Sequence, residues 1–199
     1  FYGKKPKEFK ALLHDMGMEW RSHHVIGTPF KLPPNTKLPN GPDGKPMTLP
    51  PMKNLKDNGQ EMVDLVAEAG IPYLVCANIN ISTGDEIKKS AEVLQLAGEQ
   101  AKKANVQLAY HNHATEFDAT DGIVSYDYFT SQINADLLKM ELDLGWVFKA
   151  GRNPVEIFKK NRGRFPLLHV KDMTASGEIV PFGEGAYDFK ETFQNIDIA

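Results

Sequence analysis

The chain has 199 residues, of which 41% are hydrophobic and 25% are charged, proportions typical of one globular domain with a buried core. Its 23 Lys and Arg residues are outnumbered by 26 Asp and Glu residues, so the formal net charge is −3. This balance argues against a surface that neutralises nucleic-acid phosphates or anionic lipids. No apolar run approaches the roughly 20 residues of a membrane-spanning helix. We therefore expect neither nucleic acid nor a membrane as a partner.

The single cysteine, Cys76, cannot form a disulfide within the chain. It lies in an apolar run, which favours a core residue over a nucleophile. Cysteine usage fits a reducing compartment, so we favour a cytoplasmic location. Because the chain opens on Phe1 without an initiator Met, we expect a truncated N-terminus, and a periplasmic or secreted location stays open.

Helix-like and strand-like segments alternate along the chain, judged by the spacing of apolar residues and by the glycines that follow them. In chain order, the pattern predicts a helix over 6–16, a strand over 18–25, a helix around 62–69, a strand over 73–77, a helix over 85–104, a strand over 106–111, a helix over 126–133, a strand over 137–144, a helix over 154–160 and a strand over 166–171. Repeated strand–helix units predict parallel strands covered by helices, in a barrel or a doubly wound sheet.

One segment interrupts this alternation. Residues 28–51 contain eight of the thirteen prolines, and proline fixes φ and lacks a backbone donor. The segment is expected to be a long loop, either a disordered insertion or a lid over a site. We treat residues 1–199 as a single domain with this loop inside it.

Polar side chains gather where the predicted strands end. They come from five successive strands: His23 and His24, Asn78 and Asn80, His111 and His113, Glu141 and Asp143, and His169 and Lys171. In a parallel α/β fold, the carboxyl ends of the strands form the edge at which sites are built. The sequence therefore predicts a shared site at this edge.

Alternation along each strand sharpens the candidates, because residues two apart point the same way. Glu141 thus pairs with Asp143, and His24 rather than His23 is expected to point inward. An acid between apolar neighbours, as Asp143 is, needs a partner or a cation. Together with an imidazole such as His169, it suits Mn, Zn, Fe or Co better than Ca.

Each candidate also has a purely structural explanation. A strand-end histidine is more often a satisfied structural residue than a ligand, Asp143 could cap the following turn, and Lys171 with Asp172 could form a surface ion pair. The convergence of several strands on one edge favours the functional interpretation. Competing motifs are weak, since Gly183-Glu184-Gly185 is too short for a phosphate loop and the sequence has no GxSxG motif.

Four stretches, in this order, resemble the sugar phosphate isomerase/epimerase family of xylose isomerase-like TIM barrels: QLAYHNHATEF, MELDLGWVFKAGRNP, RFPLLHVKDM and PFGEGAYDF. The resemblance implies an α/β fold, a (β/α)8 TIM barrel, of which this chain represents about strands 3–7. These strands are too few to close a barrel, so the sheet would have two exposed parallel edges. We therefore expect these residues alone to be inactive, and a homo-oligomer is compatible with such edges.

The family typically holds one divalent metal ion with a Glu, an Asp, a His and a second Glu from successive strand ends. Asp143 and His169 match two of these positions, and His111 stands at the first Glu position. The resemblance thus implies one divalent ion (Mn, Zn, Mg or Co) held by His111, Asp143 and His169. Trp146 stands where the epimerases often have a histidine.

The resemblance also implies a function, namely metal-dependent isomerisation or epimerisation of a sugar or sugar phosphate through an enediolate. The small-molecule sugar would meet Glu141 and Lys171 as catalytic residues and His24, Asn78, His113, Trp146 and Glu184 as binding residues. A sugar dehydratase or lyase of the same superfamily and a non-catalytic sugar-binding barrel stay open as alternatives. The related DNA-repair endonucleases are disfavoured by the net charge of −3.

Overall fold

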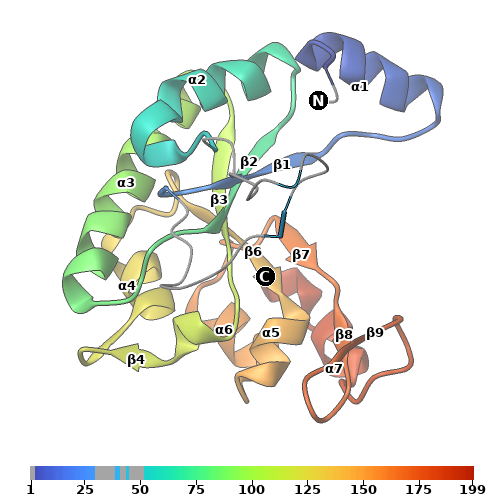
Figure 1. Cartoon of the computed structure of the whole chain (residues 1–199). Coiled ribbons are helices and arrows are strands. Elements are labelled where there is room, and N and C mark those ends of the chain that lie inside the picture. The colour runs from blue at the N-terminus through green and yellow to red at the C-terminus, as the bar shows by residue number, and fades with distance from the viewer. Residues whose placement is uncertain (1–2, 30–38, 41–43, 45–51) are drawn as a thin grey trace.

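The computed structural model describes residues 3–29, 39–40, 44 and 52–199 (Figure 1). Most of the loop predicted for residues 28–51 lies outside the described residues. The α-helices are α1 (Pro6–Asp15), α2 (Leu55–Glu68), α3 (Gly84–Lys103), α4 (Ser125–Gln132), α5 (Leu144–Lys149), α6 (Pro154–Lys160) and α7 (Phe189–Gln194). The strands are β1 (Ser22–Ile26), β2 (Tyr73–Asn78), β3 (Gln107–His111), β4 (Ala119–Thr120), β5 (Ile123–Val124), β6 (Lys139–Asp143), β7 (Leu167–His169), β8 (Asp172–Met173) and β9 (Ile179–Val180).

Five strands form one curved sheet in the order β1-β2-β3-β6-β7, and every neighbouring pair is parallel. All the carboxyl ends therefore meet at one edge. The register places His111 opposite Glu141 and Asp143 opposite His169. The prediction of parallel strands covered by helices is confirmed, and the sheet is part of a barrel rather than a closed one.

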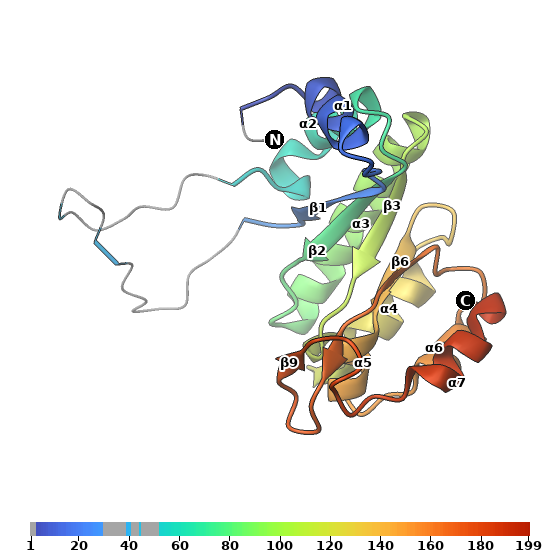
Figure 2. The same cartoon turned by 90° about the vertical axis from the view of Figure 1, so that its right-hand side faces the viewer.

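Helices α2, α3 and α4 follow one another along the outer face of this sheet (Figures 1 and 2). Side chains that alternate along the strands fill the space between the sheet and the helices: Leu74 and Cys76, Leu108 and Tyr110, Met140 and Leu142. The intervening residues of the same strands point to the inner face. His111, Glu141 and Asp143 belong to this inner set, so the outer core holds in place the strands that carry them.

The longest helix, α3, has clear sequence signals. Its N-cap Thr83 accepts a hydrogen bond from the amide of Glu86 at 3.1 Å, and Lys102 and Lys103 occupy the last turn, where they complement the helix dipole. Ile87 and Leu94 on its inner side are fully buried. These features account for the prediction of a helix over 85–104.

The strand predicted over 18–25 was wrong at its start, because β1 begins only at Ser22. The amide of Met18 donates to the carbonyl of Leu13 and so closes the end of α1. Trp20 turns back, its ring centroid 5.1 Å from that of Phe9, and its indole nitrogen donates to the carbonyl of Ser22. Trp20 thus covers α1 instead of entering the sheet.

Two antiparallel hairpins, β4-β5 and β8-β9, were not predicted, and neither were α5 and α7. Each of these strands has two residues and each of these helices has six, so they are too short to show a periodic spacing of apolar residues. Among the described residues, no helix is both long enough and apolar enough to cross a bilayer.

Candidate active site

Predicted site residues from four strands come together at the carboxyl edge of the sheet. His24 comes from β1, His111 from β3, Glu141 and Asp143 from β6, and His169 from the end of β7. Asp143 is fully buried, and His111 and Glu141 are less than a tenth exposed. These charged and titratable groups lie at the end of an otherwise apolar sheet, where they need one another or a ligand.

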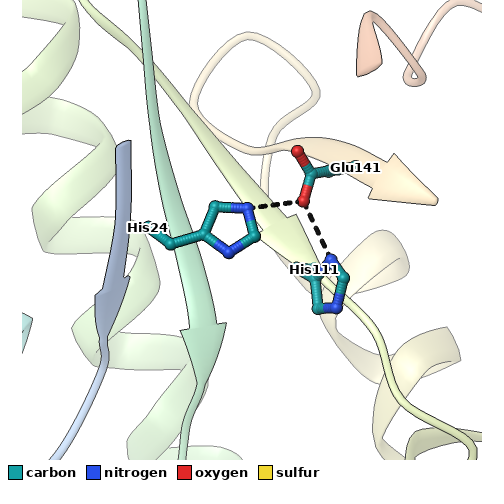
Figure 3. Close-up of side chains that lie close together, drawn as sticks. All are labelled: His24, His111 and Glu141. Carbon is teal, nitrogen blue, oxygen red and sulfur yellow. Dashed lines mark hydrogen bonds and ion pairs between the residues drawn. The ribbon is translucent and has the colours of Figure 1, made fainter. Parts of the chain in front are cut away.

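Glu141 is held by two histidines (Figure 3). Its Oε2 atom accepts a hydrogen bond from Nε2 of His24 at 2.7 Å and another from Nδ1 of His111 at 2.8 Å. Burial by itself raises the pKa of Glu141, but the two imidazole donors outweigh it and lower the pKa to about 2. Glu141 is therefore a firmly ionised carboxylate that links β1, β6 and β3.

Asp143 caps a helix with one oxygen and leaves the other for the site. Its Oδ1 accepts the amide of Trp146 at 2.9 Å, which makes Asp143 the N-cap of α5. Its own amide donates to Oδ1 of Asn112 at 3.0 Å, and this fixes the backbone of β6 against the segment after β3. The structural explanation for Asp143 therefore holds for Oδ1, while Oδ2 is unused by the helix.

Nitrogen atoms from three residues surround Oδ2 of Asp143. It lies 2.8 Å from Nζ of Lys171, 3.1 Å from Nδ1 of His169 and 3.7 Å from Nε2 of His111. None of these contacts has hydrogen-bond geometry, so this buried oxygen has three nitrogen neighbours but forms no hydrogen bond. Burial raises the pKa of Asp143, but His169, Lys171 and the Trp146 amide lower it below its usual range overall.

The donor set fits a divalent metal ion. One ligand atom from each of His111, Asp143 and His169 lies within 4.8 Å of the others, and Oδ2 of Asp143 is buried and lacks a hydrogen bond. Two imidazoles and a carboxylate suit a first-row transition ion or zinc. His24, His111 and Glu141 meet the same distance criterion, but there Oε2 of Glu141 already accepts two hydrogen bonds.

His113 is oriented by a second buried carboxylate, Glu116. The Oε2 atom of Glu116 accepts the amide of His113 at 2.9 Å, and its Oε1 atom lies 3.5 Å from Nδ1 of the His113 ring. The hydroxyl of Tyr110 donates to the same Oε1 at 2.9 Å. Burial opposes ionisation of Glu116, yet His113 and Tyr110 lower its pKa. The carboxylate therefore anchors the segment that follows β3.

The ring of Trp146 lies beside this site, with two lysines over it. Nζ of Lys171 is 4.9 Å from the ring centroid and Nζ of Lys149 is 5.0 Å from it, at cation–π distance. The His113 ring lies 5.6 Å away. Trp146 thus links Lys171 to His113, and the two lysines cover part of the ring of this predicted binding residue.

Comparison with known proteins decides the family. A family model described as a xylose isomerase-like TIM barrel matches residues 1–198. The chain belongs to the xylose isomerase-like TIM barrel family. This confirms the fold inferred from the four sequence stretches.

The chain is similar to a curated sequence relative and to solved structures. The chain is 25% identical over 133 residues to inosose dehydratase from Lacticaseibacillus casei, an alignment that covers 57% of this chain and 44% of that protein. The chain thus spans less than half of that curated relative. A sugar phosphate isomerase/epimerase from Parabacteroides distasonis ATCC 8503 has a TM-score of 0.74 at 24% identity, over 100% of this chain and 67% of that one.

A second solved structure, the IolI protein with a bound zinc atom, has a TM-score of 0.57 at 20% identity, over 71% of this chain and 55% of that chain. At these identities the likeness to solved structures supports the fold. The names of these similar proteins include an isomerase/epimerase and a dehydratase.

Within this xylose isomerase-like barrel, two predicted binding residues lie apart from the others. Asn78 is exposed at the end of β2 and lines a surface pocket of about 530 Å³ together with Asn80 and Thr115. Glu184 is exposed in the turn after β9, and no described contact joins its side chain to the metal-ligand candidates.

The ion pair weighed for Lys171 and Asp172 is wrong. Lys171 turns to Asp143, whereas the Asp172 carboxylate accepts the amides of Gly183 and Gly185 at 2.8 and 2.9 Å. Alternation explains the split, because consecutive residues leave the chain on opposite sides.

Sequence reasoning missed Asn112 and gave no role to Glu116. Both are buried polar residues that hold backbone of the site, Asn112 through Asp143 and Glu116 through His113. A polar residue directly after a buried strand is a usable signal for such a role, because burial obliges it to find a partner.

Proposed function

We propose that the protein is a metal-dependent isomerase or epimerase that acts on a sugar or sugar derivative through an enediolate. The observation that carries this proposal is the buried Oδ2 atom of Asp143, which lacks a hydrogen bond and faces His169, Lys171 and His111. A buried carboxylate oxygen among imidazoles at the carboxyl edge of a barrel sheet is suited to hold a cation against a substrate.

In this proposal His111, Asp143 and His169 hold the ion. A bound divalent ion would polarise a carbonyl and the hydroxyl next to it, so that charge developing on their oxygens is stabilised. Lys171, displaced from Oδ2 of Asp143, would donate to a substrate oxygen. Its position over the Trp146 ring keeps the ammonium group at the edge of the site.

The proton transfer falls to Glu141 and His24 acting together. A carboxylate with a pKa of about 2 is a weak base, so Glu141 is poorly suited to remove a proton directly. It can instead orient His24, whose Nε2 donates to it and whose side chain is 42% exposed. This leaves Nδ1 of His24 to accept a proton from substrate, and imidazole is the side chain matched to neutral pH.

Two further residues would contact the substrate. His113, held at Nδ1 by Glu116, presents its other ring nitrogen for a sugar hydroxyl. Trp146 offers the part of its ring that the lysines leave free. Asn78 stays a proposed contact only for a substrate long enough to reach the pocket at the end of β2, and Glu184 only for one that reaches the turn after β9.

Dehydration is the second candidate reaction. Inosose dehydratase is a named relative, and a dehydratase removes the same kind of proton before a hydroxyl leaves. Lys171 is the described cation best placed to protonate that hydroxyl, because its side chain is only 15% exposed and it faces Asp143.

Product analysis tests the proposal and separates the two reactions. The full-length protein, loaded with metal, is incubated with ketoses, aldoses and inososes, free and phosphorylated, and the products are identified by NMR and mass spectrometry. An isomer of unchanged mass supports the isomerase, and loss of water supports the dehydratase. Tight sugar binding without turnover on any member of the panel would contradict both and identify a sugar-binding barrel.

A further inference from the structure

The contact between Glu141 and His111 fixes how this histidine can bind a metal ion. Nδ1 of His111 lies 2.8 Å from Oε2 of Glu141, and both side chains are buried. An ionised carboxylate only accepts hydrogen bonds, so the imidazole must carry its proton on Nδ1. In a neutral imidazole the lone pair is then on Nε2.

The same ring turns Nε2 toward the other metal-ligand candidates. Nε2 lies 3.7 Å from Oδ2 of Asp143, too far for a hydrogen bond, and the rings of His111 and His169 have centroids 5.2 Å apart. Ligand atoms of all three residues lie within 4.8 Å of one another. Because metal–ligand bonds are about 2.0–2.2 Å long, one ion could reach all three after small adjustments.

We propose that Glu141 is the positioning residue of the metal centre: its carboxylate holds His111 in the Nδ1–H tautomer, so that Nε2 becomes a ligand beside Asp143 and His169. This rests on the proposed function for the presence of the ion. The hydrogen-bonded carboxylate also makes the imidazole a stronger ligand, as in other carboxylate–histidine–metal arrangements. The pair His111–Glu141 thereby supplies negative charge that the neutral histidine alone would lack.

His24 completes this arrangement from the far side. Its Nε2 donates to the same Oε2 atom of Glu141 at 2.7 Å, so β1 and β3 both fix the carboxylate that β6 carries (Figure 3). A second ion bound through Oε2 of Glu141 would compete with both hydrogen bonds. Oδ2 of Asp143 is a buried carboxylate oxygen without a hydrogen bond, and this favours an ion on that side of His111.

The tautomer can be measured directly in the wild-type protein. Long-range ¹H–¹⁵N NMR correlations of the histidine rings, recorded without metal, should show His111 protonated at Nδ1 and unprotonated at Nε2. The same spectrum with Zn(II) should show the Nε2 resonance shifted by coordination and Nδ1 still protonated. A proton on Nε2 in the metal-free protein, or coordination through Nδ1, would overturn the inference.

Metal affinity gives the second readout. Glu141→Gln keeps the side-chain shape and one acceptor but removes the charge, and Co(II) affinity should fall about 10–100-fold, as for other residues that support a metal ligand. The matched control is Glu116→Gln, another buried carboxylate that holds His113 instead of His111. Its Co(II) affinity and Co(II) visible spectrum should equal those of the wild type.

Equal Co(II) affinity in Glu141→Gln and wild type would contradict the positioning role. So would a wild-type protein that binds two ions per chain, if His24→Gln then binds only one. Neither experiment uses a sugar. A protein that binds one ion in the predicted way but converts no sugar would therefore defeat the proposed function and leave this inference standing.

Discussion

Nζ of Lys171 lies 2.8 Å from Oδ2 of Asp143, a fully buried oxygen that is also the proposed metal ligand. The ammonium group neutralises a carboxylate that would otherwise be costly to bury. Lysine and metal are thus alternative partners for one oxygen, and this relationship leads to the first prediction.

Lys171→Met should destabilise the metal-free protein by about 1–3 kcal/mol, because Asp143 loses a charged partner but keeps His169 and the Trp146 amide. A saturating divalent ion should remove most of this loss. Thermal unfolding with and without Zn(II) measures it. The control is Lys149→Met, which also removes a lysine over the Trp146 ring but leaves Asp143 untouched. If Lys171→Met lost the same stability with and without the metal ion, Lys171 and the ion would not share Oδ2 of Asp143.

Asp143→Asn should weaken Mn(II) or Co(II) binding by more than the roughly 10–100-fold typical of a residue that only supports a ligand. Asparagine can still accept the Trp146 amide through Oδ1, so α5 should stay capped and circular dichroism unchanged. Isothermal titration calorimetry gives the affinities. Wild-type affinity in the variant would remove Asp143 from the metal site.

Stability should depend on pH through Glu141. Its folded pKa is about 2 against an ordinary value of 4.5, so its contribution is complete above about pH 4.5 and is lost as the pH falls toward 2. The shift corresponds to about 3 kcal/mol. Urea unfolding of wild type and Glu141→Gln should therefore differ at pH 7 and converge near pH 2. A difference that is constant between pH 7 and pH 2 would contradict the lowered pKa.

Gly185 should be required for a structural reason, the close approach of the backbone to Asp172. A Cβ atom on Gly185 would collide with the Asp172 carboxylate and lie 2.5 Å from the carbonyl oxygen of Met173. Gly185→Ala should cost about 2 kcal/mol or more, the range of overpacked buried positions. Glu184→Ala, at an exposed neighbour, should leave the melting temperature unchanged. Equal melting temperatures for both variants would rule out the close approach.

Part of the fold and part of the candidate site could be predicted from the sequence alone. The parallel sheet could be predicted because its strands are apolar runs separated by helices with clear caps, such as α3 after Thr83. The inward position of His24 followed from alternation, and its contact with Glu141 agrees with that expectation. The site edge could be predicted because parallel strands share one carboxyl end.

Other features depend on contacts distant in sequence. The pairing of Glu141 with His24 spans 117 residues, and no local pattern predicts that one oxygen binds two histidines. The Trp20 side chain has the apolar character of a strand residue, yet it packs on α1. Asp143 was expected to act either as a cap or as a ligand, and only the structure assigns its two oxygens separately.

Solvent exchange tests the central claim, metal-assisted removal of a proton next to a carbonyl, most directly. The metal-loaded protein is incubated in D2O with each sugar that it converts, and the recovered sugar and product are examined by NMR. We expect deuterium at the carbon next to the carbonyl with the wild type, and none with Asp143→Asn. Turnover without any deuterium from solvent would indicate a hydride shift and contradict the account.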